Sequence, residues 1–149
     1  MILIFQPLKS WIENHDRRIY AAMTAALDES IGRIITAFKS RNAWKNTIVL
    51  FTTDNGGSTL YGGNNWPFRG LKNTLWEGGI KAVGSIKIPG VKPGKRNQLL
   101  HVSDIFPTIL DLTECLMNTE DREKLDGKSQ GLVLCLTIIS ICCFFIVRT

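Results

Sequence analysis

The sequence lacks the patterns that mark most nucleic-acid-binding and zinc-binding modules. Its four cysteines, Cys115, Cys135, Cys142 and Cys143, do not stand at the spacing of zinc ligands. It also has no helix-turn-helix pattern, no aromatic and basic RNA-binding pattern, and no internal repeat or low-complexity tract. We therefore expect no nucleic-acid partner. The formal net charge of +5 would suit another anionic ligand, and it is equally compatible with a solvated basic face.

Signals for secretion are also missing. The apolar residues 1–5 have no charged flank, no apolar core of full length and no small-residue cleavage site, so they do not form a signal peptide. No Asn-x-Ser/Thr glycosylation site is present. The sequence by itself indicates no route into the secretory pathway, and it leaves the localisation of the chain unknown.

Charge is absent from residues 131–147, which lie between Lys128 and Arg148. At ~1.5 Å per residue, a helix of this length would cover about 25 Å, just short of a hydrocarbon core of ~30 Å. The Ile, Val, Thr, Cys and Phe residues of the segment also favour a strand. Three interpretations stay open: a weak membrane anchor, a replacement tail from alternative splicing or intron readthrough, or a buried element. We favour the replacement tail and leave membrane contact through 131–147 open.

The most informative feature that is present joins a short apolar run to two oxygen-bearing side chains. Residues 47–53 are apolar and β-branched, which predicts a buried strand of a parallel sheet. In open α/β sheets, ligands bind at the carboxyl ends of such strands. Asp54 and Asn55 follow directly and offer the hard oxygen donors that Ca²⁺ or Mg²⁺ prefers. Alone, however, Asp-Asn-Gly-Gly is more typical of a turn than of a metal site.

An ordered run of glycines, tryptophans and cations follows between Gly62 and Lys81. It reads Gly-Gly-Asn-Asn-Trp-Pro-Phe-Arg-Gly-Leu-Lys-Asn-Thr-Leu-Trp-Glu-Gly-Gly-Ile-Lys. Tyr-Ala-Ala-Met stands upstream at 20–23, and His-Val-Ser-Asp-Ile-Phe-Pro-Thr stands downstream at 101–108. Together these segments resemble the sulfatase family, specifically its arylsulfatase B-like branch. The resemblance covers about residues 7–127.

The resemblance implies an incomplete alkaline-phosphatase-like α/β fold, a fragment of a doubly wound sheet. It implies a calcium ion held in part by Asp54 and Asn55, and a contact from Lys72 to the sulfate oxygens. It also implies hydrolysis of an aryl sulfate or sugar sulfate ester, in the lysosome or the secretory pathway. Arg69 and His101 are weaker candidates for the same cleft. A divalent ion and a fixed ammonium would stabilise the negative charge that develops on the sulfate oxygens.

The chain departs from the family pattern at the nucleophile and at the metal cage. The family converts the first residue of a Cys-x-Pro-x-Arg or Ser-x-Pro-x-Arg segment to formylglycine, and no cysteine or serine here begins such a segment. The family's early pair of metal-binding aspartates is missing, since only Asp16 precedes Asp28. Ca²⁺ takes about 6–8 oxygen ligands, so Asp54 and Asn55 alone would bind it weakly.

Two functional hypotheses from different classes follow. The first is a sulfatase-family chain, a calcium-dependent sulfuric ester hydrolase by resemblance, which is inactive alone because the nucleophile is missing. The alternative is a non-catalytic truncated remnant or gene-model fragment, with membrane association left open. In both cases residues 1–127 form a partial sulfatase catalytic domain, and residues 128–149 form a divergent hydrophobic tail.

The sequence predicts two helices, the first from apolar periodicity and the second from a capping residue. In the first, apolar residues at spacings of three or four form a stripe expected to pack on the sheet, with Asp16 as the N-cap and Asn42 as the stop. The stripe consists of Tyr20, Met23, Leu27, Ile31, Ile34 and Phe38. The second helix begins at a Ser103 or Asp104 cap and runs through Leu112, with Pro107 in its first turn.

A second strand is predicted at residues 82–88, and a basic surface loop punctuated by proline and glycine follows at 88–97. For His101 and Asp104, the end of a strand and the cap of a helix are favoured over a role in a substrate cleft.

Overall fold

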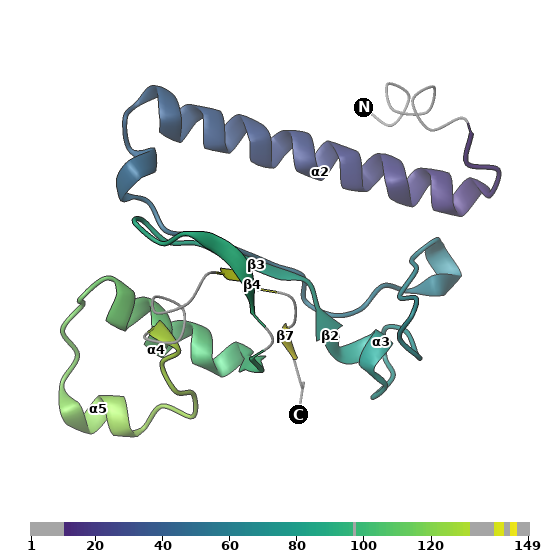
Figure 1. The fold of residues 1–149 in the computed structure, drawn as a ribbon. Coiled ribbons are helices and arrows are strands. Elements are labelled where there is room, and N and C mark those ends of the chain that lie inside the picture. The colour runs from purple at the N-terminus through teal and green to yellow at the C-terminus, as the bar shows by residue number, and fades with distance from the viewer. Residues whose placement is uncertain (1–10, 97, 132–138, 142–143, 146–149) are drawn as a thin grey trace. The chain divides into compact units, whose positions relative to one another are not determined.

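The structure is a computed structural model of the chain, and it describes residues 11–96, 98–131, 139–141 and 144–145. The chain divides into two compact units, each formed by two separate segments. The first unit contains Met1–Thr47 and Gly57–Gly79, and the second contains Ile48–Gly56 and Ile80–Thr149. Figure 1 shows the helices and strands of both.

The first unit contains one long helix, α2 (His15–Ser40), drawn in purple to blue in Figure 1. Asn14 caps it, because its Oδ1 accepts a hydrogen bond of 2.8 Å from the Arg17 N–H. The predicted cap at Asp16 is therefore wrong. Asp16 lies in the first turn, where a negative charge interacts favourably with the helix dipole. The predicted stop is confirmed, since the helix ends before Asn42, which has a φ of 57°.

The apolar stripe of α2 differs from the prediction. Five of its large side chains, Tyr20, Met23, Leu27, Ile34 and Phe38, are exposed, with exposed fractions from 39% to 62%. Among the described residues of the helix, the small side chain of Ala22 is the buried one. The periodicity correctly predicts a helix and its apolar face, but it does not specify which surface is available to cover that face.

The rest of the first unit has little regular structure. A 3₁₀ helix, η2 (Trp44–Asn46), follows α2. The segment Gly57–Gly79 is a folded loop that contains a second 3₁₀ helix, η3 (Thr59–Tyr61), and most of the short helix α3 (Glu77–Ile80).

The second unit is built on short strands. The predicted strand at 47–53 is observed as β1 (Val49–Thr52), which is half-buried rather than buried. It pairs antiparallel with β3 (Gly84–Lys87), with Leu50 opposite Ile86. The predicted parallel pairing of this strand is therefore not found among the described residues. The predicted strand at 82–88 is split into β2 (Lys81–Ala82) and β3 by Val83.

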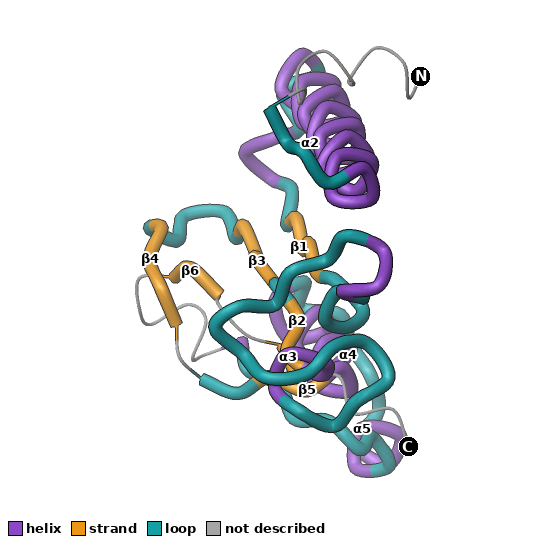
Figure 2. The backbone as a smooth tube through the Cα atoms, turned by 90° about the vertical axis from the view of Figure 1, so that its right-hand side faces the viewer, coloured by secondary structure: helices purple, strands orange, loops and turns teal. Residues whose placement is uncertain are grey.

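Two further groups of paired strands include residues of the tail. The strand β4 (Pro93–Arg96) pairs parallel with β6 (Ile139–Ile141), and Figure 2 shows them side by side. The strand β7 (Phe144–Phe145) lies between β2 and β5 (Leu100–His101). These described tail residues are thus strands, and the rest of residues 132–147 lies outside the described part of the chain. No described helix is long and apolar enough to cross a membrane.

Two helices complete the second unit, α4 (Val102–Leu112) and α5 (Thr119–Glu123). A small apolar core is formed by Ala82, Ile88 and Leu100, with Leu50 and Ile105 packed against it. Pro107 lies within α4, beyond the first turn to which the sequence assigned it. It has no N–H to donate to the Ser103 carbonyl. Gly127 approaches that carbonyl so closely that a Cβ at Gly127 would lie 2.0 Å from its oxygen.

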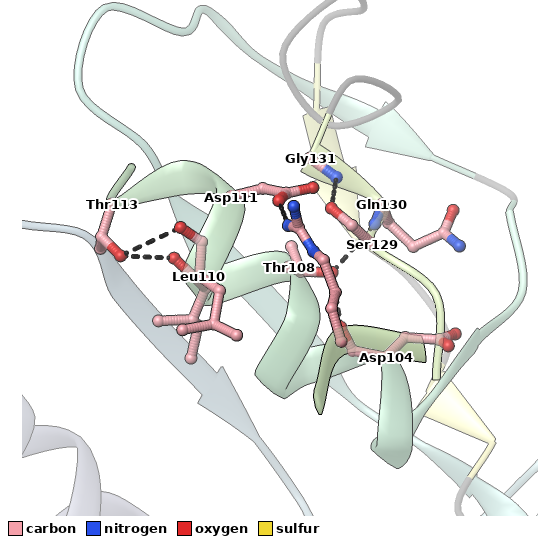
Figure 3. Close-up of polar contacts among 10 residues, drawn as sticks. Asp104, Thr108, Leu110, Asp111, Thr113, Ser129, Gln130 and Gly131 are labelled. Carbon is pink, nitrogen blue, oxygen red and sulfur yellow. Dashed lines mark hydrogen bonds and ion pairs between the residues drawn. The ribbon is translucent and has the colours of Figure 1, made fainter. Parts of the chain in front are cut away.

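The segment after Gly127 is held against α4 by polar contacts, and Figure 3 shows those of Thr108. Asp104 Oδ1 accepts a hydrogen bond of 2.8 Å from the Lys128 N–H. Thr108, which is 3% exposed, accepts one of 2.9 Å from the Gln130 N–H through its hydroxyl. The same hydroxyl donates to the Asp104 carbonyl at 2.5 Å. These contacts fix the start of the tail by satisfying its backbone N–H groups.

Candidate functional site

Asp54 and Asn55 follow the carboxyl end of β1, with Thr53 between the strand and Asp54. The strand end is fixed by two bonds between Thr53 and Val83. The Thr53 N–H donates to the Val83 carbonyl at 2.9 Å, and the Val83 N–H donates to Thr53 Oγ1 at 2.9 Å. The expected position of the pair at a strand end is therefore found.

The side-chain oxygens of this pair fit part of a calcium site. Asp54 is exposed, and its carboxylate has no hydrogen bond or ion pair within the described residues. Asn55 Nδ2 donates to the Gly56 carbonyl at 2.8 Å, which leaves its Oδ1 available. One carboxylate and one amide oxygen are suitable ligands, but calcium needs several more. The described residues contain no group of three or more His, Cys, Asp or Glu that could hold a metal ion.

The loop that carries Lys72 is organised by backbone and amide groups. The Lys72 N–H donates to the Gly57 carbonyl at 3.2 Å. Asn65 holds the same glycine twice, since its Oδ1 accepts from the Gly57 N–H at 2.8 Å and its Nδ2 donates to the Gly57 carbonyl at 2.8 Å. Asn65 Nδ2 also donates to the Gly70 carbonyl at 3.1 Å. Lys72 itself is exposed.

Two glycines in this loop show how closely its backbone is packed. Gly70 has a φ of 95°, and a Cβ there would lie 2.5 Å from the Trp76 Cβ. At Gly79, a Cβ would lie 2.4 Å from the carbonyl oxygens of Leu71 and Thr74. A side chain at either position would collide, so the loop requires glycine there.

Arg69 lies in the same loop as Lys72, but its guanidinium has a structural contact. The guanidinium carbon lies 3.8 Å from the centre of the Trp76 ring, a cation–π arrangement. The Arg69 carbonyl accepts a hydrogen bond of 2.7 Å from the Gly78 N–H. These contacts connect the two ends of the Arg69–Gly78 turn, and they give Arg69 a role that does not require a ligand.

His101 ends β5, as the favoured interpretation predicts, and it also caps α4, which the sequence did not predict. Its Nδ1 accepts from the Ser103 N–H at 3.3 Å, and its own N–H donates to Asp104 Oδ2 at 3.0 Å. Together these bonds form a capping box. The N-cap itself is His101 rather than Ser103 or Asp104, because the imidazole nitrogen replaces the usual hydroxyl or carboxylate.

The structure brings together some of the predicted site residues. Asp54 and Asn55 are adjacent in the second unit, whereas Arg69 and Lys72 share one loop of the first unit. The placement of Lys72 in the same cleft as Asp54 stays a prediction. The sequence reasoning missed Asn65. The sequence indicates a role for Asn65 only indirectly, because a glycine-rich loop exposes many backbone groups that need a polar partner.

Comparison with known proteins identifies the family. Residues 5–115 match the family model described as Sulfatase. Arylsulfatase J of Mus musculus is 44% identical over 105 residues, which cover 69% of this chain and 18% of that protein. A sulfatase of Formosa agariphila is 33% identical over 141 residues, 87% of this chain and 25% of that protein. N-acetylgalactosamine-6-sulfatase of Homo sapiens is 34% identical over 110 residues, 70% of this chain and 21% of that protein.

A solved structure agrees with these relatives. The crystal structure of Ps i-CgsB in complex with k-i-k-neocarrahexaose matches with a TM-score of 0.73 and 33% identity, over 80% of this chain and 27% of that one. The predicted fold, a fragment of the alkaline-phosphatase-like α/β fold, is thereby confirmed. The chain spans 18% to 25% of the length of the curated relatives named above. It belongs to the sulfatase family, of whose domain it contains a part.

Proposed function

We propose that the chain provides one part of a calcium-dependent sulfuric ester hydrolase site. Asp54 and Asn55 would supply two oxygen ligands of the calcium ion, and Lys72 would contact the sulfate. The observation that supports this most lies at the end of β1, where the match to sulfatases coincides with two side chains whose oxygens have no hydrogen-bond partner within the described residues. The names of the relatives favour an aryl sulfate or sugar sulfate as substrate. The lysosome or the secretory pathway is proposed as the location from the family resemblance.

The chemistry of the reaction explains why these residue types would be used. Cleavage of a sulfate ester places negative charge on the oxygens around sulfur. When bound, calcium would supply a fixed positive charge at those oxygens. The exposed ammonium of Lys72 would add a second positive charge, which is most effective where water is excluded. Neither group supplies a nucleophile.

We further propose that the chain does not turn over substrate alone. It contains no Cys-x-Pro-x-Arg or Ser-x-Pro-x-Arg segment, and removal of a nucleophile abolishes most of the rate in enzymes that use covalent catalysis. The purified chain should not hydrolyse 4-nitrophenyl sulfate above background. Turnover that disappears in Lys72→Ala but persists in Lys92→Ala, a control at another exposed lysine, would contradict this proposal.

Calcium binding tests the metal half of the proposal without depending on activity. Titration calorimetry of the chain with Ca²⁺ should give a dissociation constant weaker than about 0.1 mM, because two ligands cannot complete the coordination shell. Asp54→Asn should abolish the signal. Asp28→Asn removes an exposed carboxylate from α2 and should leave the signal unchanged. Equal affinity in Asp54→Asn and in the unsubstituted chain would show that Asp54 is not a ligand.

A further inference from the structure

We infer that Asn65 is a positioning residue that holds the backbone of Lys72 in place through the Gly57 carbonyl. The inference rests on the proposed sulfate contact of Lys72 only for its functional meaning. Its structural part concerns residues of the first unit alone. Asn65 is half-buried, whereas Lys72 is exposed.

The orientation of the Asn65 amide is set by its partners. On one side it meets the Gly57 N–H, a donor that requires the amide oxygen. On the other side it meets the carbonyls of Gly57 and Gly70, two acceptors that require the amide nitrogen. A flipped amide would oppose oxygen to oxygen at both carbonyls. Asparagine is therefore suited to this place in a way that aspartate, which has no donor when ionised, is not.

The Gly57 carbonyl connects Asn65 to Lys72. It accepts from Asn65 Nδ2 at 2.8 Å and from the Lys72 N–H at 3.2 Å, so both of its lone pairs are used. With the Gly57 N–H also bound to Asn65, the amide fixes the peptide groups on both sides of Gly57. The Lys72 N–H thus bonds to a carbonyl whose direction Asn65 determines.

The second bond of the Asn65 donor acts on the other side of Lys72. It holds the carbonyl of Gly70, two residues before Lys72. Asn65 therefore fixes both the acceptor of the Lys72 N–H and the chain that leads into Lys72. The contacts around Gly57 are close, since a Cβ on that glycine would lie 3.3 Å from Asn65 Oδ1.

The neighbouring asparagine provides a matched control. Asn64 is exposed, and its Oδ1 accepts from the Trp66 N–H at 3.0 Å, a bond within its own turn. Asn64 and Asn65 thus have the same side chain and adjacent positions, but only Asn65 bonds to Gly57 and Gly70.

The test measures amide hydrogen exchange at single residues of the full chain, for Asn65→Ala, Asn65→Asp and Asn64→Ala. We expect Asn65→Ala to accelerate exchange at least tenfold at both Gly57 and Lys72, and Asn64→Ala to change neither. Asn65→Asp keeps an acceptor for the Gly57 N–H but loses the donor to the Gly57 and Gly70 carbonyls. It should therefore accelerate amide exchange at Lys72 more than at Gly57. Acceleration at Gly57 without acceleration at Lys72 in Asn65→Ala would overturn the inference. Acceleration that spreads through α2 would also overturn it, because Asn65 would then be a general stabiliser.

A spectroscopic titration separates this inference from the proposed function. Inorganic sulfate is added to a chain with ¹³C-labelled lysines, and the Cε resonance of Lys72 is followed. We expect sulfate to shift the Lys72 Cε resonance in the unsubstituted chain and in Asn64→Ala. At the same sulfate concentration, Asn65→Ala should lose at least five-sixths of this shift. No shift in the unsubstituted chain would contradict the sulfate contact of Lys72, while the exchange result would still decide the positioning role. An equal shift in Asn65→Ala would overturn that role.

Discussion

Glycine substitutions test the packing of the Lys72 loop at the scale of single residues. Gly79→Ala would place a methyl group 2.4 Å from two carbonyl oxygens, and we expect it to lower the free energy of unfolding by about 1–3 kcal/mol, as overpacking does. Gly32→Ala is the control, because Gly32 lies inside α2 with nothing within 4 Å of the added Cβ. It should raise the free energy by ~1 kcal/mol through helix propensity.

Urea unfolding followed by far-UV circular dichroism gives both values. Equal effects of the two substitutions, or stabilisation by Gly79→Ala, would show that the close approach of the loop backbone is not maintained in solution.

At this scale, the sequence predicts residues whose position follows directly from a strand or a turn. Asp54 and Asn55 are found at the end of β1 because a strand must end before an Asp-Asn-Gly-Gly turn. Asn65 could not be predicted, because its partners lie eight and five residues away in irregular backbone. The capping role of Asn14 was missed for another reason. Asn14 and Asp16 are both good caps, and only the backbone geometry chooses between them.

At the scale of elements, the contact between α4 and the start of the tail can be tested at Thr108. Thr108→Val keeps the shape of the side chain but leaves the Gln130 N–H without its acceptor. We expect a loss of about 1–3 kcal/mol in the free energy of unfolding, the usual penalty for an unsatisfied buried donor. Thr113→Val should change it by less than ~0.5 kcal/mol, because the exposed Thr113 hydroxyl donates only to carbonyls of its own helix.

Thermal unfolding of Thr108→Val and Thr113→Val measures both changes in the free energy of unfolding. If Thr108→Val is as stable as Thr113→Val, the Thr108 contacts drawn in Figure 3 contribute nothing measurable to the stability of the chain.

The helices were predicted better than the strands, for a physical reason. The two long helices follow from local signals, the apolar spacing of α2 and the polar residues at the start of α4. Both helices are observed, although their N-caps are Asn14 and His101. The strands depend on distant partners. A single apolar run indicates β1 but not its antiparallel pairing with β3, and Val83 interrupts the second predicted strand by bonding to Thr53.

At the scale of the whole molecule, exposed apolar side chains predict self-association. Met23 and Ile34 on α2 are 62% and 58% exposed, and exposed apolar surface of this kind promotes association. Met23→Lys with Ile34→Lys should reduce the mass measured by light scattering at least twofold. Thr24→Lys with Thr36→Lys adds the same charge to exposed positions of the same helix and should reduce it less. Equal effects would assign the association to net charge instead of to the stripe.

The division into two units has an optical consequence. All four tryptophans of the chain, Trp11, Trp44, Trp66 and Trp76, belong to the first unit. Intrinsic tryptophan fluorescence therefore originates in that unit, while the β1–β3 pair and α4 contain no indole. If the units melt independently, the fluorescence midpoint will differ from the midpoint of a signal that averages over all peptide bonds. Coincident midpoints would instead mean that the two units lose their structure in one cooperative step.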